Sequence, residues 1–246
     1  MNAITPERSP VRQRALGGGL FPWAGYGFVL FFLAALVAFW PEYLSRLPRG
    51  GIYRHFHAGL MTLWFALLIA QPLLVRTGRR PLHRMLGKSS FVLAPLAVVS
   101  MVLLTHVRLQ EVTDASMRAL AILPLAMATL FAVAYALAIS YRHQPALHAR
   151  YMICTGLALV DPVGARLLGY YLPFALPDWA YQGTTFTLTD LLLLWLIWRE
   201  RGVARGRAAF PVMLAVAVVL QAMVFVFPHL SAWQAAMRWF AALPLT

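Results

Sequence analysis

The sequence predicts an all-α membrane protein in which seven helices cross the bilayer as a bundle. Of its 246 residues, 61% are hydrophobic and 12% are charged, and the mean hydropathy is +0.70. About a quarter of the residues in a soluble domain are charged, so this composition excludes a soluble enzyme, a coiled coil and a disordered tail. The apolar residues also gather in runs of about 20, the length of a helix that spans the hydrocarbon core.

Seven apolar runs are the predicted spans, and each is too long and lacks the alternation expected of a barrel strand. In chain order they are Leu20–Trp40, His57–Val75, Ser89–Thr105, Ala119–Tyr141, Tyr151–Leu172, Trp179–Trp198 and Ala208–Phe227. The first run also fits a cleaved signal peptide in part, but it is long enough to span, and Trp40 and Tyr43 follow it as interfacial anchors. Prolines inside the runs predict kinked helices.

These runs divide the chain into a basic tail at 1–19, a seven-helix transmembrane domain at 20–228 and a last segment at 229–246. In the last segment Leu230, Trp233, Met237 and Phe240 recur at helical spacing. That spacing predicts an amphipathic helix lying on the outer leaflet. A frayed tail is the alternative.

The distribution of basic residues predicts a cytoplasmic N-terminus and an outer C-terminus. The N-terminal tail and the loops after the second, fourth and sixth runs hold fourteen arginine and lysine residues, whereas the opposite side holds six. Basic loops are typically cytoplasmic. The excess of 21 Lys+Arg over 8 Asp+Glu therefore predicts contact with anionic lipids at the cytoplasmic face, and it does not indicate nucleic acid.

Histidines lie near the ends of the predicted spans and are missing from their centres. His57 and His106 fall on the outer side, and His83 and His148 on the inner side. Imidazole is a preferred ligand of haem iron, copper and zinc, so each pair is a candidate cofactor site, and His57 with His106 is also a candidate metal site. The alternatives are ordinary polar residues at the membrane boundary and, on the inner side, a phosphate site among nearby arginines.

Three ionisable residues lie within the spans, where charge is costly and often functional. Arg166 and Asp190 fall at similar depths in neighbouring runs, so we expect Arg166 to contact Asp190 or, as second choice, Asp161. Such a pair either fixes helix register or forms a site. One arginine needs only one carboxylate partner, so one of the two aspartates is in surplus. This favours uptake and release of a proton by Asp161. Arg166 would then hold a carboxylate or a substrate anion. Gln71 and Gln221 are expected to hydrogen-bond between helices.

Missing motifs exclude several chemistries. The sequence has no P-loop, no Cys-x-x-Cys and no His-Glu-x-x-His pattern. Its single cysteine, Cys154, cannot form an intramolecular disulfide. Its single lysine, Lys88, lies at the start of a span, which excludes a retinal Schiff base in the last helix.

The runs HAGLMTLW at 57–64, LHRMLG at 82–87 and PALHARYM at 145–152 resemble a group of uncharacterised bacterial multi-pass membrane proteins. Asp161, Arg166 and Asp190 extend the likeness over most of the chain. The resemblance implies a multi-pass protein of the bacterial inner membrane and no established activity.

The HAGLM start of the second run and the stretch at 83–87 are also similar to the ascorbate-type di-haem cytochrome b family of ferric and ascorbate reductases. That family holds haem between histidines in two layers, one at each membrane face. The likeness implies His57, His83, His106 and His148 as ligands of haem b. In that family four consecutive helices each give one ligand, whereas here one span carries both His83 and His106.

The leading functional hypothesis is a membrane-embedded electron-transfer protein. In it, paired histidines hold haem b or a copper or iron ion, and a quinone or a small electron donor is the partner. The alternative is a metal-free transporter, or a lipid- or small-molecule-binding protein, whose site is formed by Asp161, Arg166 and Asp190. A third reading is a subunit that only packs within a larger membrane complex.

Overall fold

The computed structural model describes residues 21–112, 114 and 118–246, and the regular elements in this part of the chain are all helical. The predicted basic tail at 1–19 lies outside the described residues. In chain order the elements are α2 (Phe21–Phe39), η1 (Leu44–Arg49), α3 (Ile52–Arg76), α4 (Arg80–Glu111), α6 (Ile122–Ser140), α7 (Pro145–Cys154), η2 (Leu157–Leu159), α8 (Val160–Tyr171), α9 (Asp178–Arg199), α10 (Ala209–Val226), η3 (Phe227–His229) and α11 (Ser231–Ala241).

Five helical segments of the described chain are long and apolar enough to cross a membrane, which confirms an all-α protein of membrane-spanning character. They are Ile52–Arg76, Arg80–Glu111, Ile122–Ser140, Pro145–Tyr171 and Ala209–His229. The apolar part of α2, Trp23–Phe39, is shorter. α9 is not among the five segments, because its stretch Gln182–Asp190 contains four threonines besides Gln182 and Asp190.

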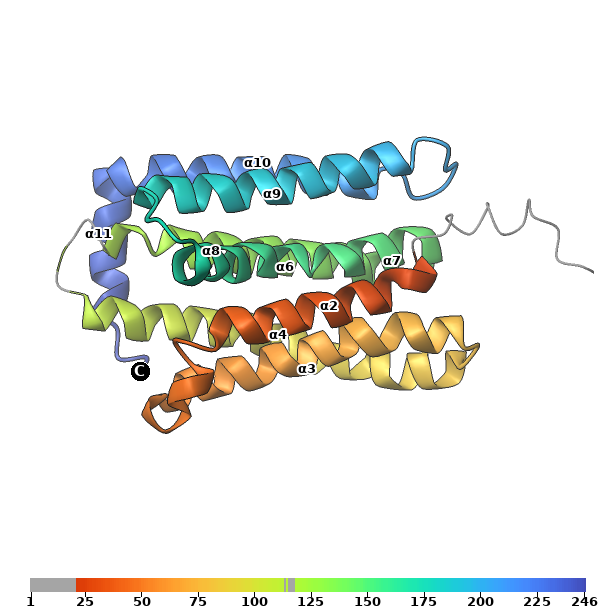
Figure 1. The fold of residues 1–246 in the computed structure, drawn as a ribbon, viewed down its shortest axis with the longest axis horizontal. Helices are drawn as coiled ribbons and strands as arrows, with labels where there is room; N and C mark the ends of the chain where they lie inside the picture. The colour runs from red at the N-terminus through yellow and green to blue at the C-terminus, as the bar shows by residue number, and fades with distance from the viewer. Residues whose placement is uncertain (1–20, 113, 115–117) are drawn as a thin grey trace, which may run out of the picture.

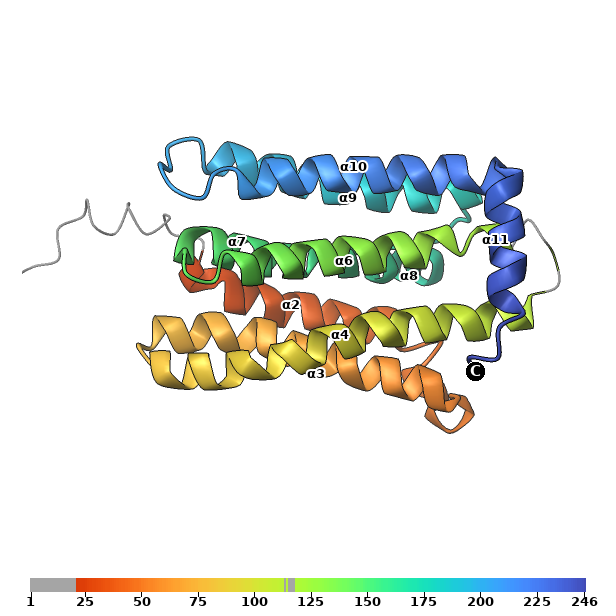
Figure 2. The ribbon, with the colours of Figure 1, turned by 180° about the vertical axis from the view of Figure 1, so that it is seen from behind.

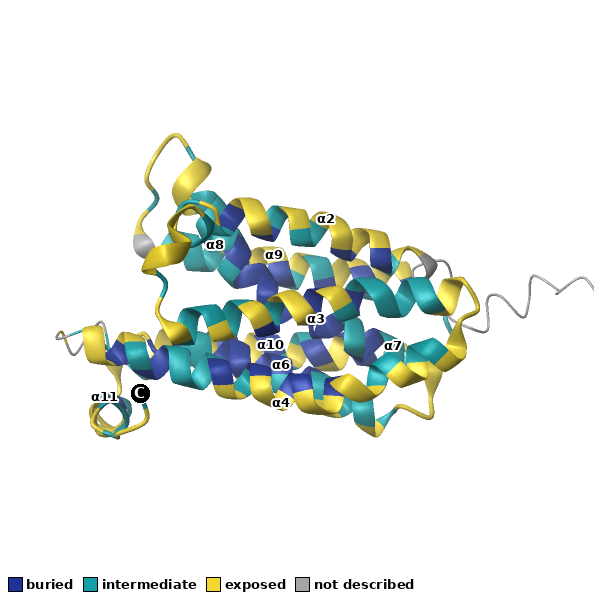
Figure 3. Cartoon of the chain, turned by 90° about the horizontal axis from the view of Figure 1, so that it is seen from below, coloured by how far each residue is buried: buried dark blue, intermediate teal, exposed yellow. Residues whose placement is uncertain are grey.

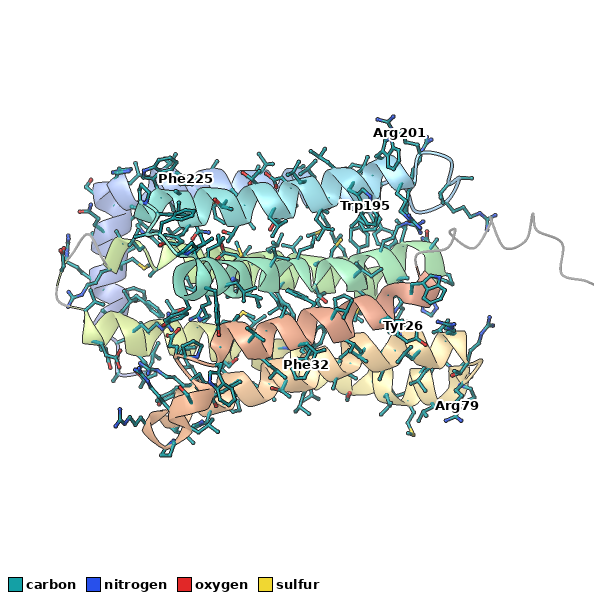
Figure 4. All side chains as sticks on the ribbon, in the orientation of Figure 1. Tyr26, Phe32, Arg79, Trp195, Arg201 and Phe225 are labelled. Carbon is teal, nitrogen blue, oxygen red and sulfur yellow. The ribbon has the colours of Figure 1, made fainter. Side chains whose placement is uncertain are left out.

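Most helices run side by side along one long axis, and α11 lies across one end of them (Figures 1 and 2). α3 packs against α2 and α4, while α10 packs against α9 and α6. Figure 4 shows Arg79, after α3, and Arg201, after α9, at the end of the bundle away from α11. The two loops therefore lie at the same end of the bundle, as the distribution of basic residues predicts.

The interior of the bundle is tightly packed and its outer surface is apolar. Trp64 is completely buried and packs edge-on against Phe131, with ring centroids 4.9 Å apart. Figure 3 shows buried residues facing inward along the helices and exposed residues on the outside. Large apolar side chains such as Leu30, Val92 and Val219 are among the exposed ones. An apolar exterior of this extent is suited to lipid rather than to water.

The fifth predicted span is broken into α7, η2 and α8. At the end of α7, Thr155 donates a hydrogen bond to the Met152 carbonyl at 2.7 Å and accepts one from Trp64 Nε1 at 3.2 Å. Gly156 follows, and a Cβ there would lie 2.6 Å from Phe28 Cε1, so only glycine lets α2 approach so closely. The break starts a new helix inside the bundle, with α8 packed on α2 and α9 (Figure 1).

The helix α11 closes the end of the bundle opposite the basic loops (Figure 2). Met237 is buried on its inner face, and Trp233 Nε1 donates to the Ala119 carbonyl at 2.9 Å. Trp239, on the other face, is 66% exposed. The amphipathic helix predicted from the sequence pattern is therefore present, and its position on the outer leaflet stays a prediction.

Candidate functional site

Asp161 lies in the first turn of α8, directly after the break in the fifth span. It is 4% exposed, and its Oδ1 accepts hydrogen bonds from Thr185 Oγ1 at 2.5 Å and from Gln182 Nε2. Both partners belong to α9, and Thr185 is itself buried. The helix break therefore places a carboxyl group against the polar half of the neighbouring helix.

A second carboxyl group, Asp190, lies further along α9, where its Oδ1 accepts a hydrogen bond from Gln221 Nε2 of α10 at 2.9 Å. Gln221, Thr189 and Asp161 line one cavity of about 10 Å³, which is roughly the space that one water molecule requires. We call this group of side chains on α8, α9 and α10 the polar layer. It comprises Asp161, Gln182, Thr185, Thr189, Asp190 and Gln221.

No cation forms an ion pair with Asp161 within the described part of the chain. Arg166 acts on it through space without touching it. Burying an isolated ionised carboxylate costs several kcal/mol, so such a group binds a proton or a cation instead. The surroundings of Asp161 therefore favour uptake of a positive charge.

Arg166 pairs with Glu42, so the expected contact of Arg166 with Asp190 or Asp161 is wrong. Its Nε donates to Glu42 Oε2 at 2.9 Å, and its guanidinium lies 4.3 Å from the centre of the Phe39 ring. The expectation placed Arg166 by counting along one continuous helix. Because the span breaks, α8 follows its own direction and carries Arg166 to the end of α2.

A row of ion pairs ties this end of the bundle together. Glu42 also lies 3.6 Å from Arg108, and Arg54 lies 3.6 Å from Glu111. The row joins the turn after α2 to α3, α4 and α8. These side chains are partly exposed, and exposed pairs contribute at most about 1 kcal/mol each. These ion pairs therefore stabilise the fold only weakly, and the fold is expected to remain intact without them.

The outer histidines His57 and His106 have separate partners. Ser100 Oγ donates to the Ala97 carbonyl at 2.7 Å, so it accepts from His57 Nδ1–H at 3.0 Å, which leaves His57 Nε2 with a free lone pair. His106 is six residues beyond Ser100 on α4, about 9 Å along the helix and about 240° around it. The hydrogen-bond partner of its Nδ1 is Thr246, at 2.7 Å.

The surroundings of His106 are those of a packed core residue. Its ring is completely buried and meets Phe240 of α11 edge-on, with ring centroids 5.1 Å apart. Its Nε2 is buried and has no hydrogen-bond partner among the described residues. Within the same residues, no group of three or more His, Cys, Asp or Glu is arranged to hold a metal ion.

The inner histidines His83 and His148 lie close enough for their charges to interact. His148 Nδ1–H donates to the Ala138 carbonyl at 2.8 Å, which orients its Nε2 as a lone-pair donor. Gln71, with its amide oxygen accepting from the Gly87 N–H at 3.0 Å, donates its amide nitrogen to His83 Nδ1. A neutral His83 then carries its proton on Nε2, the wrong tautomer for a metal bond through that atom.

Arg150 and Glu200 form a buried ion pair that the sequence analysis missed. Arg150 Nε donates to Glu200 Oε2 at 2.5 Å and Arg150 Nη2 to Glu200 Oε1 at 2.8 Å, with 0% and 4% of the side chains exposed. Arg150 Nη1 donates to the Ala146 carbonyl at 2.7 Å. The sequence signal is weak because Arg150 belongs to the basic loop before the fifth run and Glu200 follows the sixth run, so neither residue lies within a predicted span.

No protein-family model matches the chain, and comparisons with curated proteins and with solved structures found no significant match. The two resemblances seen in the sequence therefore remain hypotheses. The class of the protein follows from its fold: in the part of the chain that the structure describes, it is an all-helical protein with five segments long and apolar enough to cross a membrane.

Proposed function

We propose that the chain is a metal-free, proton-coupled membrane transporter in which Asp161 takes up and releases the proton. One observation carries the proposal: a buried carboxyl group sits at a helix break, bonded to Thr185 and Gln182 and to no cation of the described chain. Broken helices inside membrane proteins commonly border the sites of coupling ions. Ionisable groups at such places take up and release protons along transport pathways.

Replacing Asp161 by asparagine tests this function. Asparagine keeps the size of the side chain and an oxygen that accepts from Thr185, but it cannot bind or release a proton. In proteoliposomes with an internal pH dye and an imposed pH difference, the wild type is expected to show proton flux. The D161N variant is expected to fall to the rate of protein-free vesicles.

The control variant is Glu42→Gln, which changes a carboxyl group outside the polar layer. Its proton flux is expected to match that of the wild type. Equal flux in the wild type and in D161N, with both proteins folded, contradicts the proposal. Infrared spectra of the purified proteins provide a second measurement, because a protonated Asp161 adds a carboxylic acid band that D161N lacks.

We further propose that α2 and α9 join the five apolar segments to make seven spans in a bacterial inner membrane. The N-terminus then lies in the cytoplasm. The basic loops after α3 and after α9, and the basic turn before α7, face anionic lipids. Reporter fusions after Lys88 and after Arg207 are both expected to report a cytoplasmic position. A signal from the opposite side at either point contradicts this topology.

A haem-binding electron-transfer protein with a quinone or small electron donor is the second candidate function. The proximity of His83 and His148 and the orientation of His148 Nε2 favour it. The tautomer that Gln71 imposes on His83 opposes it. An absorption spectrum of the purified protein separates the two functions, because bound haem b produces a Soret band and a metal-free transporter has none.

A further inference from the structure

An open groove of about 240 Å³ lies where α11 crosses the end of the bundle, beside α4 and α6 (Figure 2). Val102 of α4 and Leu125 of α6 line one side of the groove, and α11 lines the other side with Trp233, Ala236 and Phe240. These side chains are aliphatic or aromatic, and the indole N–H of Trp233 is already bonded to a backbone carbonyl. The groove is therefore suited to a hydrocarbon ligand.

The groove continues into the lipid-facing surface of the bundle along α4. Phe91, Pro95 and Val99 are exposed and recur at helical spacing with Val102, so the four side chains lie on one side of the helix. From Val102 back to Phe91 this apolar stripe is about 16 Å long, at 1.5 Å per residue. One leaflet of the hydrocarbon core is about 15 Å thick. The stripe therefore has the length of an acyl chain that reaches from the membrane surface to the bilayer centre.

On α6 the side chains that follow Leu125 along the same side of the helix are small. Thr129, Ala132 and Ala136 recur at helical spacing, and each is at least partly exposed. α6 packs against α4 and runs in the opposite direction, so both series of side chains start at the groove and lead away from α11 (Figure 2). Small side chains leave room for a hydrocarbon chain close to the α6 backbone.

From this geometry we infer that the groove holds one acyl chain of a membrane phospholipid, with α11 covering the outer end of the chain. A chain that enters from the bilayer follows apolar surface over its whole length, from the stripe on α4 to Trp233 and Phe240 of α11. It also removes from water the hydrocarbon surface that an empty groove would leave exposed. The inference depends on the membrane-spanning character of the bundle and not on the role proposed for Asp161.

Ala236→Trp is the variant for the site, and Ala235→Trp is its matched control. Both alanines are exposed on α11, so both variants are expected to fold. Ala236 lines the groove, whereas Ala235 lies about 100° around the helix from it. An indole at position 236 displaces several methylene groups of the bound chain. A236W is expected to weaken phospholipid binding at least about tenfold, because loss of two buried methylene contacts has that effect, and A235W is expected to bind as the wild type does.

The test uses the purified full-length protein, stripped of lipid in lauryl maltoside and then titrated with dioleoylphosphatidylethanolamine at constant detergent. Native mass spectrometry counts the bound phospholipid, and the wild type is expected to retain one molecule that A236W loses. The Tm of the wild type is expected to rise with the phospholipid, because a ligand of the folded state stabilises it. Glycerophosphoethanolamine, which has the headgroup but no acyl chains, is expected to leave the Tm unchanged.

Three outcomes overturn the inference. The first is equal phospholipid retention in the wild type, A235W and A236W. The second is a Tm that rises as much with glycerophosphoethanolamine as with the phospholipid, because the headgroup alone would then be bound. The third is a mass of two protein chains in the wild type that A236W reduces to one, because a second copy would then occupy the groove. The wild-type series with and without acyl chains decides the matter even where A236W does not fold.

Discussion

Replacement of Arg150 by glutamine is expected to lower the free energy of unfolding by about 3–5 kcal/mol, the usual effect of breaking a buried ion pair. Arg150 is completely buried, and it binds both carboxylate oxygens of Glu200. The variant leaves the Glu200 carboxylate without its partner inside the packed end of the bundle. Unfolding of the purified protein in detergent, followed by circular dichroism, measures the loss.

The double variant R150M/E200L distinguishes a pair effect from simple loss of packing. Two apolar side chains of similar volume remove both charges, and such replacements of buried pairs are often neutral or stabilising. The double variant is thus expected to be more stable than R150Q. Glu42→Gln, which breaks two partly exposed pairs, with Arg166 and with Arg108, is expected to cost about 2 kcal/mol or less. If R150Q lowers the free energy of unfolding no more than E42Q does, burial does not make the Arg150–Glu200 pair more important than the exposed pairs.

Gly206→Ala is expected to destabilise the same end of the bundle by about 2–4 kcal/mol, from left-handed strain and overpacking combined. Gly206 has φ +83°, and a Cβ there would lie 2.7 Å from Arg150 Nη1 and 3.1 Å from the Ala146 backbone. The loop between α9 and α10 approaches the buried guanidinium so closely that a methyl group must displace it.

Gly78 provides the matched control for that variant. It also has a positive φ, of +74°, but a Cβ there meets nothing within 4 Å. Gly78→Ala is expected to show only the conformational penalty, about 1–2 kcal/mol. The difference between the two midpoints of thermal unfolding measures the contact with Arg150. Equal midpoints would mean that the loop after α9 moves away without cost.

The helical segments were predictable from the sequence because long apolar runs have few physical alternatives. Asp161 and Asp190 were visible for the same reason, since a carboxylate stands out in an apolar run. Neither their separate partners nor the course of α8 could be predicted. Residues flanking Gly156 are as apolar as those of an unbroken span, and the close approach of Phe28 that requires the glycine is a tertiary contact.

Ion pairs were the least predictable part. Glu42 follows the first apolar run and Arg166 lies 124 positions later, so only the folded chain brings them together. Arg150 and Glu200 both lie outside the predicted apolar runs, where no pattern indicates burial. Their burial depends on how the loop that contains Gly206 folds over them, which no local pattern reports. The four candidate histidines lie near the ends of helices, but their hydrogen-bond partners, which decide their chemistry, come from the folded chain.

The break between α7 and α8 also determines how fast a thiol reagent can label the protein. Cys154 is the single cysteine of the chain, it is completely buried, and it is the last residue of α7. A membrane-permeant thiol reagent can reach it only when the packing around the break loosens. The labelling rate of the unmodified protein therefore reports how often this region opens.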